Sequence, residues 1–190
     1  MGRLLSFFLP LLTVFLLSQP AQALESPVGA DELWILVDEP SSSLSVYRGS
    51  QEITHFPRIS VGRGGVKRLR REGDRSTPLG TFHINRIKLD SDFHIFLGLD
   101  FPTPEIAREA WSAGRMSFIE YADFMAYLQQ NGEPPQDTVL GGYIGIHGLG
   151  DGDPDFHRRY DWTQGCVAVT NEQIEQLLSL IEIGTTVVIR

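Results

Sequence analysis

Short apolar segments, each closed by residues that favour turns, constrain the fold of this chain most strongly. Residues 33–37 are apolar and end at Asp-Glu-Pro, and residues 44–47 alternate and end at Arg-Gly-Ser. Residues 53–56 continue through Pro57 into residues 58–62, where a proline is tolerated only in a kinked or edge strand. We therefore expect three consecutive antiparallel strands.

Further strands are expected over residues 81–87, 93–99, 139–146, 167–169 and 185–189, and helical signals interrupt them. Thr103 caps a helix to about residue 113, and Ser117 caps a second helix that ends at Asn131-Gly132. Asn171 is expected to cap a helix over residues 172–181. The fold class is thus mostly β (α+β), with a helical insertion around residues 103–131 and a helix near the C-terminus.

An apolar face on the second inserted helix recurs at spacings near 3.6 residues. Such a stripe is typical of core or lid packing rather than of a cofactor site, and the two inserted helices could wall one side of a cleft. Its members are Phe118, Ile119, Phe124, Met125 and Leu128.

The N-terminus has the pattern of an export signal. Arg3 precedes a nearly continuous apolar run over residues 4–17, and Ala21-Gln22-Ala23 is a small-x-small cleavage site. We expect a signal peptide over residues 1–23 and one domain over residues 24–190, with no membrane span after cleavage. A retained anchor is the alternative, although the run is short for a span and contains Pro10.

The net charge is −8, and it becomes −9 when Arg3 leaves with the signal. A broad basic face for nucleic acid is therefore not expected. Five basic side chains nevertheless occur among glycines over residues 63–73, namely Arg63, Lys67, Arg68, Arg70 and Arg71. We interpret this stretch as a solvated mobile loop, with a loop that contacts a ligand as the alternative.

Cys166 is the only cysteine of the chain, so it has no disulfide partner within it. In an exported protein a lone thiol is either a small buried apolar group or a catalytic nucleophile. His147-Gly148 lies nineteen residues earlier, and an imidazole is the neighbour that a thiol needs for ionisation. We expect the strands carrying His147 and Cys166 to be adjacent and antiparallel, with acyl transfer through a thioester.

Two further interpretations follow from the same residues. The amides of Gly165 and Cys166 are candidates for an oxyanion hole, because glycine lets the backbone approach closely. A zinc site of Cys166 and His147 with His157 or nearby aspartates is disfavoured, because the paired spacings of structural zinc sites are lacking. We expect no metal and no cofactor.

The order of these motifs resembles the L,D-transpeptidase (YkuD) family. His147-Gly148, then Thr163-Gln164-Gly165-Cys166 and then Asn171, resembles its catalytic motif. Upstream, Val61-Gly62, the segment 77–82 and the segment 99–102 are similar to family segments, and downstream Gly184 opens a Gly-Thr-x-Val-x-Ile strand like that of the family. The resemblance covers nearly all of residues 24–190.

The resemblance implies a β-sandwich-like catalytic domain and a periplasmic enzyme of the Gram-negative type. It implies that Cys166 is the nucleophile, that His147 is the base and then the acid, and that the Gly148 carbonyl orients the imidazole. The expected partners are peptidoglycan tetrapeptide stems as donor and an amine as acceptor. The acyl group would come from the L-centre of meso-diaminopimelate.

Two positions depart from the family pattern. Ala168 stands where the family usually has Arg, and Gln164 stands where it often has His. Since alanine cannot hold a carboxylate, substrate binding is expected from Thr163 and Gln164 beside the thiol, and from Arg158 and Arg159 unless these are plain solvated charges. Two alternatives to a transpeptidase stay open, a murein hydrolase (L,D-carboxypeptidase or amidase) and a non-catalytic wall-binding module.

Overall fold

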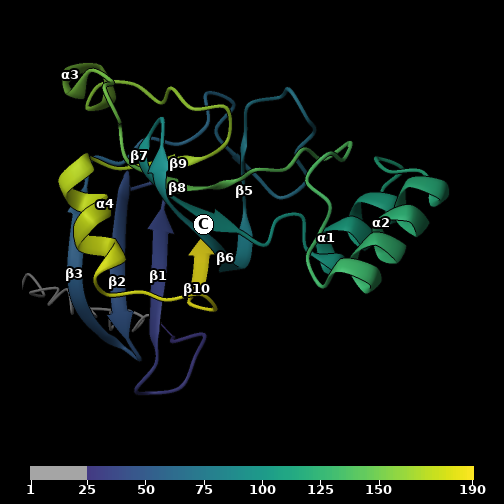
Figure 1. Ribbon diagram of the computed structural model, residues 1–190, viewed down its shortest axis with the longest axis horizontal. Coiled ribbons are helices and arrows are strands. Elements are labelled where there is room, and N and C mark those ends of the chain that lie inside the picture. Colours follow the sequence, from purple (N-terminus) through teal and green to yellow (C-terminus); the bar gives the residue numbers. More distant parts are fainter. Residues whose placement is uncertain (1–24) are drawn as a thin grey trace, which may run out of the picture.

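The structure of the protein is a computed structural model that describes residues 25–190. The expected signal over residues 1–23 lies outside the described residues. The strands are β1 (Leu33–Asp38), β2 (Ser43–Arg48), β3 (Gln51–Pro57), β4 (Val66–Lys67), β5 (Thr77–Pro78), β6 (Gly80–Ser91), β7 (His94–Leu99), β8 (Gly145–His147), β9 (Val167–Ala168) and β10 (Thr186–Ile189). The helices are α1 (Pro104–Ser112), α2 (Phe118–Asn131), α3 (Pro154–His157) and α4 (Asn171–Leu178) (Figure 1).

One large sheet has the strand order β3-β2-β1-β10-β6-β7-β8-β9, and β4 and β5 form a separate parallel pair. The pairs β1–β2 and β2–β3 are antiparallel hairpins, as predicted, and β3 with Pro57 is at the edge. β10 returns to lie parallel to β1 and antiparallel to β6. The predicted mostly β class is confirmed.

β6 is twelve residues long and joins two halves of the sheet. Its first part pairs with β10, and from Ile84 onward it pairs with β7, with a register irregularity between Ile84 and Arg86. At the other end, Ser60 and Ala168 exchange two backbone hydrogen bonds of 3.0 and 2.8 Å, which tie β9 to the segment after β3. Both halves contribute to one hydrophobic core, in which Val37, Leu97 and Val167 are fully buried.

The two inserted helices form where the sequence predicts them. The Thr103 side chain accepts from the Ile106 amide, and Ser117 makes a capping box with Glu120. Both helices stand beside the strands at one end of the molecule (Figure 1).

The apolar face predicted on α2 is buried only in part. Phe118 and Ile119 are 64% and 71% exposed, and Phe124 alone in α2 is buried. Tyr121 and Leu128 of α2 are partly buried against the core, whereas Met125 and Tyr127 are exposed.

Two expected strands are shorter than predicted, because the backbone turns into the left-handed region. Arg58 has φ +63°, which ends β3 at Pro57 and leaves residues 58–62 with isolated bridges only. Gly141 and Tyr143 have φ +78° and +53°, so the strand expected over residues 139–146 is reduced to β8.

The helix near the C-terminus is capped by Thr170 rather than by Asn171. The Thr170 hydroxyl oxygen accepts from the Gln173 amide, and the Gln173 side-chain oxygen accepts from the Thr170 amide, so α4 begins at Asn171. Ile174 and Leu177 are buried under α4, which packs against β7 and β8. None of the helices between residues 25 and 190 is long and apolar enough to cross a membrane.

Candidate active site

β8 and β9 bring the imidazole and the thiol to the same face of the sheet. They pair in parallel, with Ile146 opposite Val167 and His147 opposite Ala168, so the expected antiparallel pairing is wrong. A parallel pair needs a crossover, which the segment containing α3 supplies. Because side chains alternate along a strand, Cys166, two residues before Ala168, lies on the face that carries His147.

His147 is held in one orientation by its neighbours. Its side chain is 2% exposed, and its Nδ1–H donates to the Gly148 carbonyl oxygen over 2.6 Å. Since a carbonyl only accepts, the neutral ring carries its proton on Nδ1 and leaves Nε2 as an acceptor. The rings of Phe93 and Trp162 lie 4.2 and 5.8 Å from the imidazole, centroid to centroid. Burial lowers the pKa of His147 to about 4, against the raising effect of the Gly148 carbonyl.

Asn171 holds the backbone that follows His147. Its Oδ1 accepts from the amides of Leu149 and Gly150 at 2.8 and 3.0 Å, and its Nδ2 donates to the Gly150 carbonyl at 2.9 Å. A Cβ at Gly148 would lie 2.7 Å from Asn171 Oδ1 and 2.8 Å from the Phe93 carbonyl. Only glycine fits there, which explains the His-Gly step of the sequence.

Cys166 is partly exposed and lines a pocket of about 380 Å³. Its thiol donates to the Tyr143 carbonyl over 3.4 Å, and it makes no hydrogen bond to His147 in the described chain. Burial raises the pKa of the Cys166 thiol to about 11, although a hydrogen bond with the Gly145 backbone and the Arg70 cation act to lower it. At neutral pH the resting site therefore holds a neutral thiol and a neutral imidazole.

Thr163 organises the turn that carries the thiol. Its side chain is buried, its hydroxyl donates to the Cys166 carbonyl over 2.6 Å, and its Oγ1 accepts from the Gly165 amide over 3.1 Å. The hydroxyl thus holds the turn. It does not face a ligand, although Thr163 was expected to bind substrate. Since the Gly165 N–H is engaged, the Cys166 amide is left as the candidate donor to an oxyanion.

Comparisons with known proteins are consistent with this geometry. The model of the YkuD family, the L,D-transpeptidase catalytic domain, matches residues 32–189. The chain belongs to this family. A search of curated protein sequences finds no match.

Solved structures share the fold at low sequence identity. The helical cell shape determining protein Pgp2 from Campylobacter jejuni is 18% identical, with a TM-score of 0.56, over 90% of this chain and 52% of that one. Bd1075 from Bdellovibrio bacteriovorus is 22% identical, with a TM-score of 0.54, over 87% of this chain and 50% of that one. The chain therefore spans about half the length of these structures, and the likeness establishes the fold.

The structure does not bring Arg158 and Arg159 to the thiol. Both line a separate pocket with Arg58 and Tyr160, and Arg158 pairs with Asp155 in α3. Gln164, by contrast, is exposed next to the turn that carries the thiol. Of the expected substrate-binding residues, Gln164 alone is both beside the thiol and open to solvent.

Two cations of the thiol pocket were missed by the sequence reasoning. Arg86 and Lys88 lie on one face of β6 and line the pocket with Asp90 and Asp92, and Phe93, Phe96 and Tyr143 supply its aromatic walls. In the described residues neither cation forms an ion pair. Their period-2 spacing in the sequence was the available signal, because it places both side chains on the same side of a strand.

Arg70 corrects the interpretation of the basic stretch over residues 63–73. Arg63, Lys67, Arg68 and Arg71 are exposed, as expected of a solvated loop, but the Arg70 side chain is only 4% exposed. It lies next to the turn that carries the thiol. One residue of the loop thus belongs to the interior.

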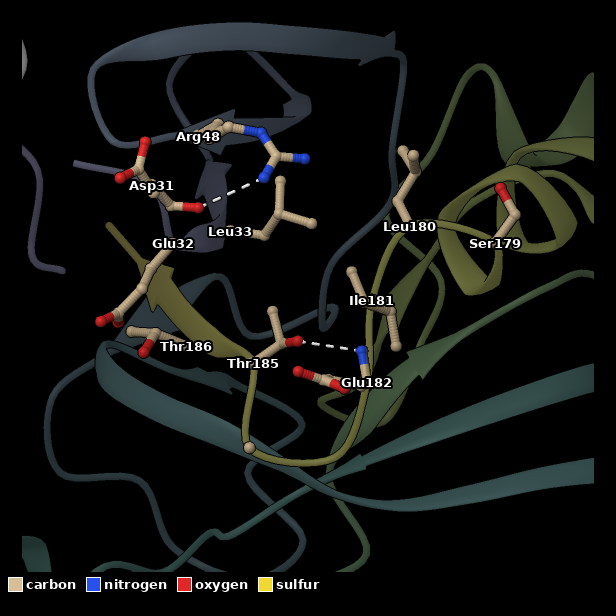
Figure 2. A pocket seen from close by; sticks show the side chains of 11 residues that line it. Asp31, Glu32, Leu33, Arg48, Ser179, Leu180, Ile181, Glu182, Thr185 and Thr186 are labelled. Atoms are coloured by element: carbon tan, nitrogen blue, oxygen red, sulfur yellow. Dashed lines mark hydrogen bonds between the residues drawn. The ribbon is translucent and has the colours of Figure 1, made fainter. Parts of the chain in front are cut away.

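A second cavity, of about 540 Å³, lies between the start of β1 and the end of α4 (Figure 2). Asp31, Glu32, Arg48 and Thr185 are among its polar lining residues, and it contains neither a thiol nor an imidazole.

Within residues 25–190, no group of three or more His, Cys, Asp or Glu side chains is arranged to hold a metal ion.

Proposed function

We propose that this chain is a cysteine-dependent L,D-transpeptidase that acts on peptidoglycan stem peptides in the periplasm. One observation carries the proposal. Cys166 opens into a pocket, and His147 lies on the same face of the sheet with its Nε2 free to accept a proton. A thiol and an oriented imidazole are the parts that covalent acyl transfer needs.

The first half-reaction begins when the Cys166 thiol turns from the Tyr143 carbonyl towards His147. Its proton moves to Nε2 as the sulfur attacks the carbonyl carbon at the L-centre of meso-diaminopimelate. The Cys166 amide donates to the oxyanion of the tetrahedral intermediate. The C–N bond then breaks, the terminal D-Ala takes the proton from the imidazolium, and a thioester remains.

The second half-reaction runs in reverse with a new nucleophile. The acceptor amine gives a proton to Nε2 of His147 and attacks the thioester carbonyl. The C–S bond breaks, the sulfur regains the proton, and a new amide links two stems. Because its pKa is about 4, the His147 ring is unprotonated at neutral pH and can accept a proton, but it is a weaker base than an imidazole whose pKa lies near the working pH.

The charges of the pocket support a stem peptide as donor. Such a peptide carries carboxylates and the side-chain ammonium of meso-diaminopimelate, and the pocket offers both signs of charge. Arg86 and Lys88 would hold carboxylates, and Asp90 or Asp92 would hold the ammonium group. In this proposal the two β6 cations take the anchoring role that Ala168 cannot perform.

A hydrolase of the same chemistry is the second candidate. The Cys166 pocket is lined by exposed charged side chains and is open to solvent, so water can reach a thioester formed there. The product would then be a shortened stem, as from an L,D-carboxypeptidase, or a protein released by an amidase. The Campylobacter jejuni neighbour is described as helical cell shape determining, and either activity of this chain would affect wall shape.

Product analysis separates these functions. The mature protein is incubated with purified disaccharide tetrapeptide, and the products are followed by mass. Loss of D-Ala with dimer formation is the transpeptidase result, and loss of D-Ala without dimers is the hydrolase result. Unchanged substrate would contradict both and leave a wall-binding module. A Cys166→Ala variant serves as the control and is expected to be inactive.

A further inference from the structure

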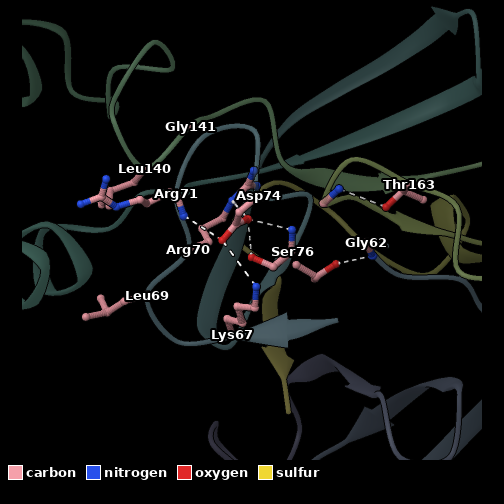
Figure 3. Close-up of polar contacts among 12 residues, drawn as sticks. Gly62, Lys67, Leu69, Arg70, Arg71, Asp74, Ser76, Leu140, Gly141 and Thr163 are labelled. Atoms are coloured by element: carbon pink, nitrogen blue, oxygen red, sulfur yellow. Dashed lines mark hydrogen bonds and ion pairs between the residues drawn. The ribbon is translucent and has the colours of Figure 1, made fainter. Parts of the chain in front are cut away.

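Arg70 carries a buried charge without adequate partners. It is the one Arg or Lys side chain between residues 25 and 190 that is buried, and neither Nε nor Nη1 has a hydrogen-bond partner there. Asp74 is the acid that comes nearest, 4.0 Å from Nε. Its carboxylate already accepts from the Ser76 amide, the Ser76 hydroxyl and the Arg71 amide at 2.9, 2.6 and 3.0 Å (Figure 3). The Asp74 carboxylate is therefore occupied by hydrogen bonds within its own turn.

The guanidinium lies between the two backbone segments that surround the thiol. A Cβ at Gly165 would lie 2.6 Å from Nη1, and a Cβ at Gly141 would lie 3.3 Å from Nη2. The Phe101 ring packs on it, 5.7 Å from Cζ to the ring centroid. Gly165 precedes Cys166, and Gly141 lies two residues before Tyr143, whose carbonyl accepts from the thiol. Arg70 thus touches both segments without lining the Cys166 pocket.

A buried and poorly paired guanidinium is costly to a fold, because it loses its hydration without regaining hydrogen bonds. An apolar side chain would fill the same space without that cost. Its fit also depends on Gly165, since a Cβ at residue 165 would lie 2.6 Å from Nη1. The arrangement is therefore better explained by what the charge does to its neighbours than by packing.

The neighbour on which the Arg70 charge acts is the Cys166 thiol. Arg70 is the cation that acts on Cys166 from the interior, while Arg86, Lys88, Asp90 and Asp92 face it from the solvated pocket, where their effects are screened. Glu72 and Asp74 act on Arg70 itself. In a buried environment an opposite charge favours the ionised form of an acid.

We propose that Arg70 is a positioning residue of the active site, which fixes the Gly165–Cys166 turn and supplies the interior positive charge that favours the Cys166 thiolate. This role rests on the proposed function only in that the thiolate is the attacking species. The loop of residues 63–73 would then supply a guanidinium that Ala168 cannot provide.

The test is the alkylation of Cys166 by iodoacetamide, followed by intact mass across a range of pH, because only the thiolate reacts. Arg70→Met removes the charge and keeps an apolar stem, Arg70→Lys keeps the charge, and Arg71→Met removes an exposed cation of the same loop. We expect Arg70→Met to react about tenfold more slowly than the wild type at a given pH below the thiol pKa, which corresponds to a shift of about one pKa unit. Arg70→Lys should recover most of the rate, and Arg71→Met should match the wild type.

A wild-type pH profile in Arg70→Met would overturn the proposal, even if its melting temperature fell, because Arg70 would then only fill space. If Arg70→Met does not fold, Arg70→Lys decides: a rate about tenfold below that of the wild type, although the charge is kept, would contradict the role of the charge. The assay needs no stem peptide. A wild type that alkylates as expected but leaves tetrapeptide unchanged would refute the proposed function and leave the role of Arg70 intact.

Discussion

Acidification should destabilise this protein through His147. The ring is buried and its pKa in the folded chain is about 4, whereas the ordinary value is 6.5. Below the ordinary pKa the unfolded chain binds a proton at His147 that the folded chain does not bind. The contribution of the neutral ring to the free energy of unfolding is therefore complete above that value and is lost as the pH falls towards the folded pKa. Between about pH 7.5 and about pH 5, these two pKa values predict that His147 alone removes about 2 kcal/mol from the free energy of unfolding.

Equilibrium unfolding in urea at both pH values measures this loss. His157 is also buried, and burial lowers its pKa too, so the wild type should lose more than the His147 contribution. A His147→Gln variant isolates it, because glutamine does not titrate and its amide can still donate to the Gly148 carbonyl. We expect the variant to lose about 2 kcal/mol less than the wild type over this pH range. Equal losses in the two proteins would refute the reasoning that burial keeps this imidazole neutral.

Two further predictions concern the pocket and the turn. Arg86→Met or Lys88→Met should raise KM for the stem tetrapeptide about tenfold, the effect of losing one charged contact, whereas Arg158→Ala should leave KM unchanged; steady-state kinetics measures both. An equal rise in KM for Arg158→Ala would contradict this assignment. Thr163→Val should lower the free energy of unfolding by about 1–3 kcal/mol, since the Gly165 amide loses its acceptor inside the protein, and denaturant unfolding at neutral pH should detect the loss. A variant as stable as the wild type would show that this hydroxyl does not hold the turn.

Local signals predicted much of the architecture. The hairpins of β1 to β3 follow from short apolar segments closed by turn residues, and both inserted helices begin at their predicted caps, Thr103 and Ser117. One cap was misassigned although the signal was present. Thr170 has a glutamine three residues later, at Gln173, and this capping box outweighs the isolated cap preference of Asn171.

Features that depend on tertiary packing could not be read from the chain. The long segment between His147 and Cys166 accommodates either a hairpin or a crossover, so spacing alone did not determine that β8 and β9 are parallel. The burial of Arg70 was equally hidden, because five cations of one loop have the same chemistry. Only the close approach to Gly165 and Gly141 selects Arg70 for the interior.

The nucleophilic role of Cys166 is tested most directly by the intact mass of the protein shortly after mixing with disaccharide tetrapeptide. We expect a covalent adduct equal to the donor less its terminal D-Ala, located on the peptide that contains Cys166, with one D-Ala released for each adduct. Cys166→Ala should form no adduct, and His147→Gln should form it much more slowly. Release of D-Ala by Cys166→Ala at the wild-type rate would contradict the central claim that this thiol is the nucleophile.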